Sequence, residues 1–221
     1  MSAARRPAKG SNNRQSAYVA RNRRELLHSG QKILAKFGPT ATIEEIISIS
    51  QVSPTTIYKY FESRENFLAM AQLSLWQEWE EWASGASQEI SDPLERFINP
   101  IRLLIRVNAT HPQLAQSLGN PTSSPEFLIK HLSENSSKIA QTLAKAGVVS
   151  SESQEARFLL FAYAVVAIIK IAITGTSLNS AECEKMLVIA MGLLGISEVK
   201  AKRSISKKLS IPVISSKQDH S

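Results

Sequence analysis

The sequence has a single cysteine, Cys183, among its 221 residues. One thiol excludes an internal disulfide framework and is typical of proteins in a reducing cytosol. Aromatic residues make up only 6% of the chain, and no stretch keeps the polar–apolar alternation of a half-buried strand. Leu, Ile and Ala are abundant instead, and the chain is long enough to bury a sizeable core. We therefore predict an all-α protein located in the cytoplasm.

Residues that could form an enzyme or metal site are not brought together by the sequence. The four histidines, His28, His111, His131 and His220, lie in separate segments, and none has metal-ligand spacing with Cys183. There is no Gly-rich phosphate loop, no His-Glu-x-x-His motif and no nucleophile elbow. We therefore expect no enzymatic activity, no metal and no cofactor.

The longest apolar run, Phe158–Thr174, is the only stretch that suggests a membrane span. It is shorter than the roughly 20 residues that a span needs, and Lys170 interrupts it. A helix that is apolar on all sides is normally buried on all sides, so we expect contacts with the core and with a second protomer. The basic N-terminus lacks the apolar segment of a signal peptide, and we expect neither a signal peptide nor a membrane partner.

Acidic residues are absent from the first 24 positions, which carry seven Arg and Lys. Residues 25–197 hold 13 basic and 17 acidic side chains, and the part from Glu198 onward holds six basic and two acidic. A mildly acidic body with basic ends favours nucleic acid bound at defined places. A basic leader can simply be solvated, but ahead of the motif described next we favour phosphate or minor-groove contacts, as homeodomain arms make.

The segment Thr42–Phe61 predicts two short helices joined by a tight turn. Ile43, Ile46 and Ile47 give the first helix an apolar face. Ser53 can cap the second, and the proline that follows suits the first helical position, where its missing N–H costs nothing. The exposed faces of the second helix carry hydroxyl, phenol and ammonium groups, which contact phosphates and base edges. This pattern is typical of a helix-turn-helix whose second helix enters the major groove.

This segment with its flanks, from Arg24 to Leu68, resembles the DNA-binding domain of TetR-family transcriptional regulators. Its most specific part is Tyr-x-Tyr-Phe-x-Ser-basic-Glu. The matching residues are Leu34, Ala35, Gly38, Ile46, Val52, Ser53, Thr56, Ile57, Tyr58, Tyr60, Phe61, Ser63, Arg64 and Glu65. Ile47 departs from the usual small alanine. Gln51 replaces the turn glycine, at a cost of about 1 kcal/mol if the turn needs a left-handed backbone.

The DNA contacts are expected from the basic residues ahead of the motif and from the polar residues of the motif itself. The predicted DNA-binding residues are Arg21, Arg23, Arg24, Thr42, Ser53, Thr55, Thr56, Tyr58, Lys59, Tyr60 and Arg64. The resemblance implies a homodimer that binds a two-fold symmetric double-stranded DNA operator.

Four parts of the chain are expected: a disordered basic arm (1–16), a helix-turn-helix domain (17–62), a helical effector-binding and dimerisation domain (63–196) and a basic flexible tail (197–221). Periodicity and capping residues predict a first helix over 17–37 and, after the motif, helices near 63–83, 92–108, 111–119, 126–147, 151–174 and 180–194. That makes about nine helices, the number that the resemblance implies.

The second domain offers candidates for a small-molecule pocket, and the resemblance is the main reason to expect one. Trp76, Trp79 and Trp82 share one face of the helix after the motif. Core packing is the simpler interpretation, although one ring can both pack and line a cavity. The candidate effector-binding residues are Trp79, Trp82, Leu104, Asn108, His131 and Tyr163.

By resemblance, the last two helices of each subunit form a four-helix dimer interface. The candidate interface residues are Phe161, Ala164, Ile168, Leu187 and Met191. The sequence thus predicts a DNA-binding transcriptional regulator, a repressor released from its operator by a small, largely apolar effector. The alternatives are a helical interaction module and a non-specific DNA binder that keeps the fold without reading an operator.

Overall fold

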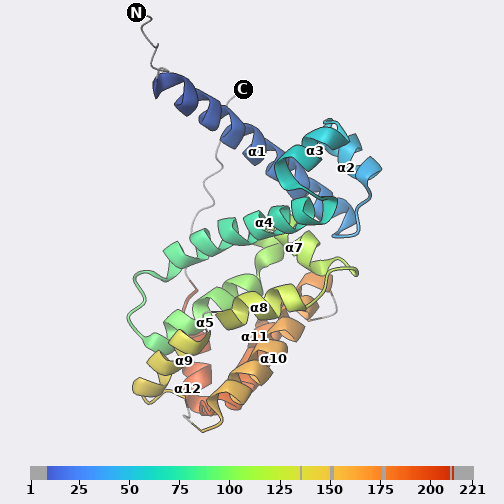
Figure 1. Ribbon diagram of the computed structural model, residues 1–221. Coiled ribbons are helices and arrows are strands. Elements are labelled where there is room, and N and C mark those ends of the chain that lie inside the picture. Colours follow the sequence, from blue (N-terminus) through green and yellow to red (C-terminus); the bar gives the residue numbers. More distant parts are fainter. Residues whose placement is uncertain (1–8, 135, 150–151, 176–177, 210, 212–221) are drawn as a thin grey trace, which may run out of the picture.

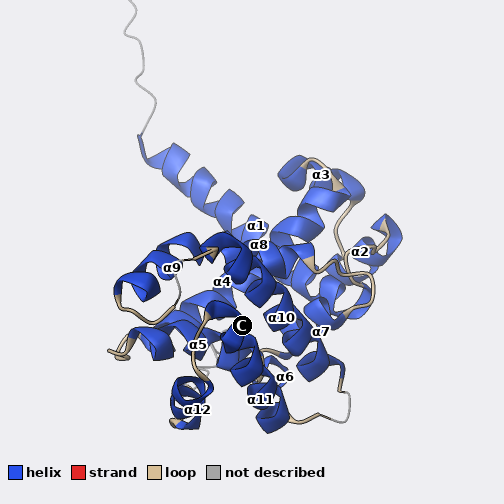
Figure 2. Ribbon diagram, turned by 90° about the horizontal axis from the view of Figure 1, so that it is seen from below, coloured by secondary structure: helices blue, strands red, loops and turns tan. Residues whose placement is uncertain are grey.

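The computed structural model describes residues 9–134, 136–149, 152–175, 178–209 and 211, which form helices without any strand (Figure 2). The first helices are α1 (Lys9–Phe37), α2 (Ile43–Ser50), α3 (Pro54–Phe61), α4 (Arg64–Ser87), α5 (Pro93–Leu104) and α6 (Val107–Thr110). They are followed by α7 (Pro112–Gly119), α8 (Glu126–Glu134), α9 (Ser136–Lys145), α10 (Gln154–Thr174), α11 (Ser180–Met191), the 3-10 helix η1 (Gly192–Leu194) and α12 (Glu198–Ser206). The prediction of an all-α protein is confirmed.

The helices form a small and a larger unit that share α4 (Figure 1). α2 and α3 pack beside the C-terminal half of α1, and the N-terminal half of α1 projects beyond them. α4 crosses below this group and leads into the bundle of α5 to α12. At 1.5 Å per residue, α4 is about 36 Å long, so it reaches from one unit well into the other.

The small unit has its own hydrophobic core, made by α1, α2, α3 and the first turns of α4. Its buried residues are Leu26, Ile33, Leu34, Ala41, Ile46, Ile57, Phe61, Phe67, Leu68 and Ala71. Gly30 lets α1 and α4 approach closely, since a Cβ there would lie 2.7 Å from Ala71 Cβ and 2.9 Å from Phe67 Cζ. Any larger residue at this position would force the two helices apart.

The larger unit is organised around α10, which is apolar on most sides. By length and composition, α10 is the one described helix that could cross a membrane, and 39% of its most apolar window is buried inside the structure. Lys170, which interrupts the apolar run, is half-buried and donates a hydrogen bond to the carbonyl of Leu118 at the end of α7. Burial lowers the pKa of this ammonium group.

The described residues contain twelve α-helices rather than about nine, because two expected helices are divided and the C-terminal segment adds α12. The helix expected over 92–108 breaks between α5 and α6. At the break, the Arg106 guanidinium donates a hydrogen bond to the carbonyl of Arg102, and the Arg106 N–H donates to the carbonyl of Leu103. The one expected over 126–147 forms α8 and α9, on either side of position 135, which lies outside the described residues. Gly147 ends it as predicted, with a left-handed backbone.

The ends of the chain also differ from expectation. α1 begins at Lys9 rather than near residue 17, so positions 9–16 form its first turns, and positions 1–8 lie outside the described residues. No proline follows Pro7 until after the end of α1, so the helix can extend outward from its packed half.

The tail that was expected to be flexible forms α12 as far as Ser206. Ala201 is fully buried, and the Lys207 carbonyl accepts a hydrogen bond from Arg102 Nη1 at 3.0 Å. The Lys207 ammonium also pairs with Glu95 of α5. Positions 210 and 212–221 lie outside the described residues.

Candidate functional site

The turn between α2 and α3 has the geometry of a helix-turn-helix. Thr42 caps α2 in a capping box with Glu45, and Ser53 caps α3 through a hydrogen bond from Thr56 N–H. Between them Gln51 is left-handed, with φ of 54°, and its N–H bonds to the carbonyl of Ile47. A backbone that usually requires glycine is therefore kept here by glutamine.

α3 presents a polar face to solvent and buries the opposite face. Ile57 and Phe61 are inside the core of the small unit, whereas Thr55, Tyr58 and Lys59 are exposed, Tyr58 by 46%. Tyr60 is half-buried, and its ring lies 5.9 Å from Lys59 Nζ. Short polar and basic groups on an exposed helix can contact base edges and phosphates in the major groove.

The predicted DNA-binding residues of α1 lie near the middle of the helix, beside α3. Arg24 is exposed, Arg21 forms an exposed ion pair with Glu25, and Arg23 lies over the Phe61 ring at 5.3 Å. These side chains and the polar face of α3 therefore belong to one end of the molecule (Figure 1).

Arg64, also predicted to bind DNA, forms hydrogen bonds within the protein at the start of α4. Its Nη1 donates to the carbonyl of Ala41 at 2.8 Å, and Nε and Nη2 bond to the Glu65 carboxylate. The hydrogen bond from Arg64 lowers the pKa of Glu65. Arg64 thus ties α4 to the segment that leads into α2, and its guanidinium has little left to offer a phosphate.

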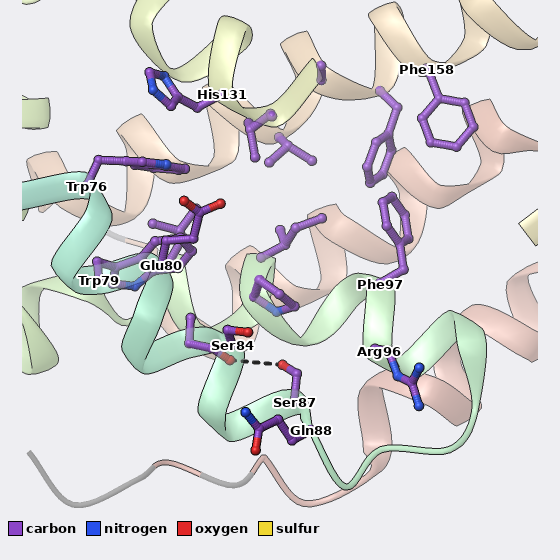
Figure 3. A pocket seen from close by; sticks show the side chains of 18 residues that line it. Trp76, Trp79, Glu80, Ser84, Ser87, Gln88, Arg96, Phe97, His131 and Phe158 are labelled. Atoms are coloured by element: carbon purple, nitrogen blue, oxygen red, sulfur yellow. Dashed lines mark hydrogen bonds between the residues drawn. The ribbon is translucent and has the colours of Figure 1, made fainter. Parts of the chain in front are cut away.

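The larger unit contains a cavity of about 550 Å³ between α4, α5, α8 and α10. Its walls are largely aromatic and aliphatic, with Trp76 and Trp79 from α4, Phe97 from α5 and Phe158 from α10 (Figure 3). A volume in the range of about 300–1,000 Å³ with apolar walls is typical of sites for small organic molecules.

The polar groups of this cavity come from few residues. His131 Nδ1 lies 2.8 Å from the Phe127 carbonyl, so in the neutral ring Nδ1 carries the proton and Nε2 is an acceptor. Ser87 is already engaged, donating to the carbonyl of Ala83 and accepting from Asn99 Nδ2. Arg96 lies at the other end from Glu80 and bonds to the carbonyl of Ile90 through Nε at 2.8 Å (Figure 3).

The structure brings three of the six predicted effector residues, Trp79, Leu104 and His131, together at the cavity. The other three lie elsewhere. Trp82 packs on the His111 ring at 4.8 Å, Asn108 donates to the carbonyls of Ala172 and Ile173, and Tyr163 is exposed by 54% on α10. Several residues of this wall were not predicted from the sequence: Glu80, Ser84, Gln88, Arg96, Phe97 and Phe158.

Four of the five residues predicted for the dimer interface are buried within the protomer and present little surface to a second copy. Ile168 is 2% exposed and both Leu187 and Met191 are 0% exposed, while Phe161 lines the cavity. Ala164 is half-buried. The exposed apolar side chains of α10, α11 and η1 are instead Leu159, Leu160, Tyr163, Ile189 and Leu193.

Neither a scan against protein-family models nor a search of curated proteins found a match. Solved structures do match over most of the chain. RolR in complex with resorcinol superimposes with a TM-score of 0.69 at 18% identity, covering 89% of this chain and 100% of RolR. A TetR-family transcriptional regulator from Pectobacterium atrosepticum gives a TM-score of 0.57 at 17% identity, covering 81% and 93%.

A gamma-butyrolactone receptor described as ArpA-like gives a TM-score of 0.56 at 13% identity, covering 85% of this chain and 94% of the receptor. These similarities cover 81–89% of this chain. The chain therefore has the fold of the TetR-type transcriptional regulators, as the helix-turn-helix resemblance predicted.

Proposed function

We propose that this protein is a sequence-specific DNA-binding transcriptional regulator whose operator affinity depends on a small molecule held in the aromatic cavity. The observation that carries the proposal is the course of α4. This helix contributes Phe67, Leu68 and Ala71 to the core of the small unit, and Trp76 and Trp79 to the cavity wall. A displacement of α4 at the cavity would therefore move the DNA-reading end with it.

The polar face of α3 and the arginines of α1 would make the contact with DNA. α3 would enter the major groove with Thr55, Tyr58 and Lys59 toward the bases and phosphates. The basic N-terminal turns of α1 project from the same end and would reach the flanking backbone (Figure 1). Phosphate contacts supply affinity for any sequence, so operator choice would depend on α3.

The active form would be a homodimer built on the exposed apolar side of α10 and α11. Leu160 and Tyr163 lie one turn apart on α10 and are more than half exposed. Covering them with a second copy would remove apolar surface from water and place two α3 helices on successive major grooves. The same cover would explain why a helix as apolar as α10 reaches the surface of a cytoplasmic protein.

We further propose that the protein acts as a repressor and that the ligand releases it. The structural neighbours RolR, solved with resorcinol, and the gamma-butyrolactone receptor carry names that point to small organic ligands on this fold. A ligand can shift the operator equilibrium only if it binds the two arrangements of α4 with different affinities. A ligand that fits the cavity better in one position of α4 than in the other would produce this difference.

Selection of bound sequences from random DNA duplexes tests the DNA-reading part. A two-fold symmetric motif, bound at physiological salt with an affinity well above that for random DNA, is the expected outcome. Enrichment of no motif, with binding that only tracks salt concentration, would instead identify a non-specific binder. No DNA binding at all would favour a helical interaction module.

A further inference from the structure

One carboxylate that lines the cavity is exposed and has no charged partner among the described residues. Glu80 of α4 lines the cavity together with Trp76 and Trp79. Within the part of the chain that the structure describes, its carboxylate forms no ion pair and no side-chain hydrogen bond, unlike Glu78, which accepts from Gln31 Nε2 at 2.8 Å. A carboxylate in such a place is poised to accept a positive group from a ligand.

The residues around this carboxylate offer π surfaces. Trp76 and Trp79 have their ring centroids 4.9 Å apart, and the His131 ring lies 5.2 Å from that of Trp76. Figure 3 shows the carboxylate of Glu80 in the same corner as these three rings. The indole N–H groups of both tryptophans are buried without a partner among the described residues, so neither is exposed as a donor at the cavity surface.

The cavity's own cation is kept away from this corner. Arg96 holds the Ile90 carbonyl through Nε and Nη2, and its guanidinium points out of the cavity at the end opposite Glu80 (Figure 3). The free polar groups beside the tryptophans are therefore acceptors, namely the Glu80 carboxylate and Nε2 of His131 in its neutral form. Aromatic faces and a carboxylate together attract organic cations.

Resting on the proposed function, we propose that the effector is an organic cation with an apolar or aromatic body. Its charged nitrogen lies between Glu80 and the rings of Trp76 and Trp79. The apolar body extends toward Phe97, Phe158 and Leu104, which line the rest of the cavity. A neutral ligand would leave the carboxylate without a partner and lose the attraction of the ring faces for positive charge.

The test uses two probes of nearly identical shape, benzyltrimethylammonium and its uncharged counterpart neopentylbenzene. Binding to the full-length protein is followed by tryptophan fluorescence and checked by calorimetry. The variant Glu80→Gln keeps the size of the side chain and removes its charge. Glu81→Gln is the matched control, because Glu81 is the next residue on α4, is exposed and does not line the cavity.

Glu80→Gln should weaken binding of the cation by about tenfold, a limited loss because a carboxylate open to solvent is partly screened. The affinity for neopentylbenzene should stay within about twofold of the wild-type value. Glu81→Gln should change neither. Equal losses for both probes, an unchanged affinity for the cation, or no binding of the cation at millimolar concentration would each overturn the assignment. Binding of resorcinol that depends on His131 but not on Glu80 would also overturn it, in favour of a neutral hydroxyl-bearing ligand.

Operator affinity, measured separately with each probe, distinguishes this inference from the proposed function. Glu80-dependent binding of the cation without any change in operator affinity would contradict ligand control while keeping the ligand class. Release of the operator by neutral compounds, equally in wild type and Glu80→Gln, would keep ligand control and overturn the ligand class.

Discussion

Gln51 occupies a left-handed backbone position, with φ of 54°, and its side chain is exposed. A non-glycine residue in this region costs about 1 kcal/mol or more, and an exposed amide gains little in return. Gln51→Gly should therefore stabilise the protein by about 0.5–1 kcal/mol, part of the gain being lost to the greater freedom of the unfolded chain. Thermal denaturation of wild type, Gln51→Gly and Gln51→Ala provides the measurement. Alanine, which has a Cβ, should bring no gain, and a similar gain from both variants would contradict the argument.

Tyr58 and Lys59 are the residues of α3 on which operator recognition is expected to depend most. Both are exposed and neither belongs to a core, so Tyr58→Phe combined with Lys59→Ala should leave the helical content and melting temperature nearly unchanged. Operator affinity should fall by about tenfold to a hundredfold, the loss typical of one or two base or phosphate contacts. A gel shift at physiological salt measures it. Undiminished affinity would remove α3 from the interface.

Among single residues, the sequence was informative where side-chain chemistry has a fixed geometric role. Ser53 was predicted to cap α3, and its oxygen accepts from Thr56 N–H. The side of α10 that faces a second copy could not be chosen from the sequence, because α10 is apolar on nearly every side. Hydropathy therefore could not distinguish Ile168, which is buried, from Leu160, which is exposed. The choice depends on which neighbouring helices cover each side, a long-range property that no local pattern contains.

At the scale of elements, the first turns of α1 offer a test of the electrostatic contact with DNA. Deleting residues 1–16 removes four cations, Arg5, Arg6, Lys9 and Arg14. If all four contact phosphates, the slope of log K against log salt should become shallower by about 3–4. Operator and random DNA should both be weakened. An unchanged slope would mean that these turns are only solvated.

The exposed side of α10 is part of the proposed homodimer interface. Leu160 is 58% exposed, so Leu160→Glu should leave the protomer folded but place a charge in the proposed interface. An unpaired charge there costs several kcal/mol, which corresponds to a loss of dimer affinity of more than a hundredfold. Sedimentation at micromolar concentration gives the answer, with Val19→Glu on α1 as the control that should stay dimeric. A Leu160→Glu protein that is still dimeric would move the interface elsewhere.

The ends of elements were predictable where glycine or a cap stops a helix, as Gly147 and Gly175 do with left-handed backbones. Elements stabilised by distant partners were not. α12 was expected to be flexible because its sequence is rich in charge, yet Ala201 is buried and Arg102 holds the Lys207 carbonyl. The break between α5 and α6 likewise depends on where the Arg106 guanidinium lies. Such contacts depend on the tertiary structure.

In the whole molecule, filling the cavity without a ligand should imitate a ligand. Ala83 of α4 is 2% exposed and lines the cavity, so Ala83→Leu would occupy part of the roughly 550 Å³ beside it. We expect a fall in operator affinity of about fivefold or more, within the usual range of coupling between two sites. Gly85→Leu is the matched control, because a Cβ at Gly85 meets nothing within 4 Å. Equal operator affinities for both variants and wild type would separate the cavity from the reading end.

The sharing of α4 between two cores also sets where this protein can be recombined with another. A hybrid protein joined after residue 62, at the domain boundary that the sequence suggested, would lack Phe67, Leu68 and Ala71, which belong to the core of the small unit. The small unit also depends on later residues of α4, because Gln31 of α1 donates hydrogen bonds to Ser74 and Glu78. An exchange that keeps the small unit intact must therefore carry α4 through Glu78, although the core of the larger unit already begins at Leu75, so the two units overlap by about one helical turn of α4.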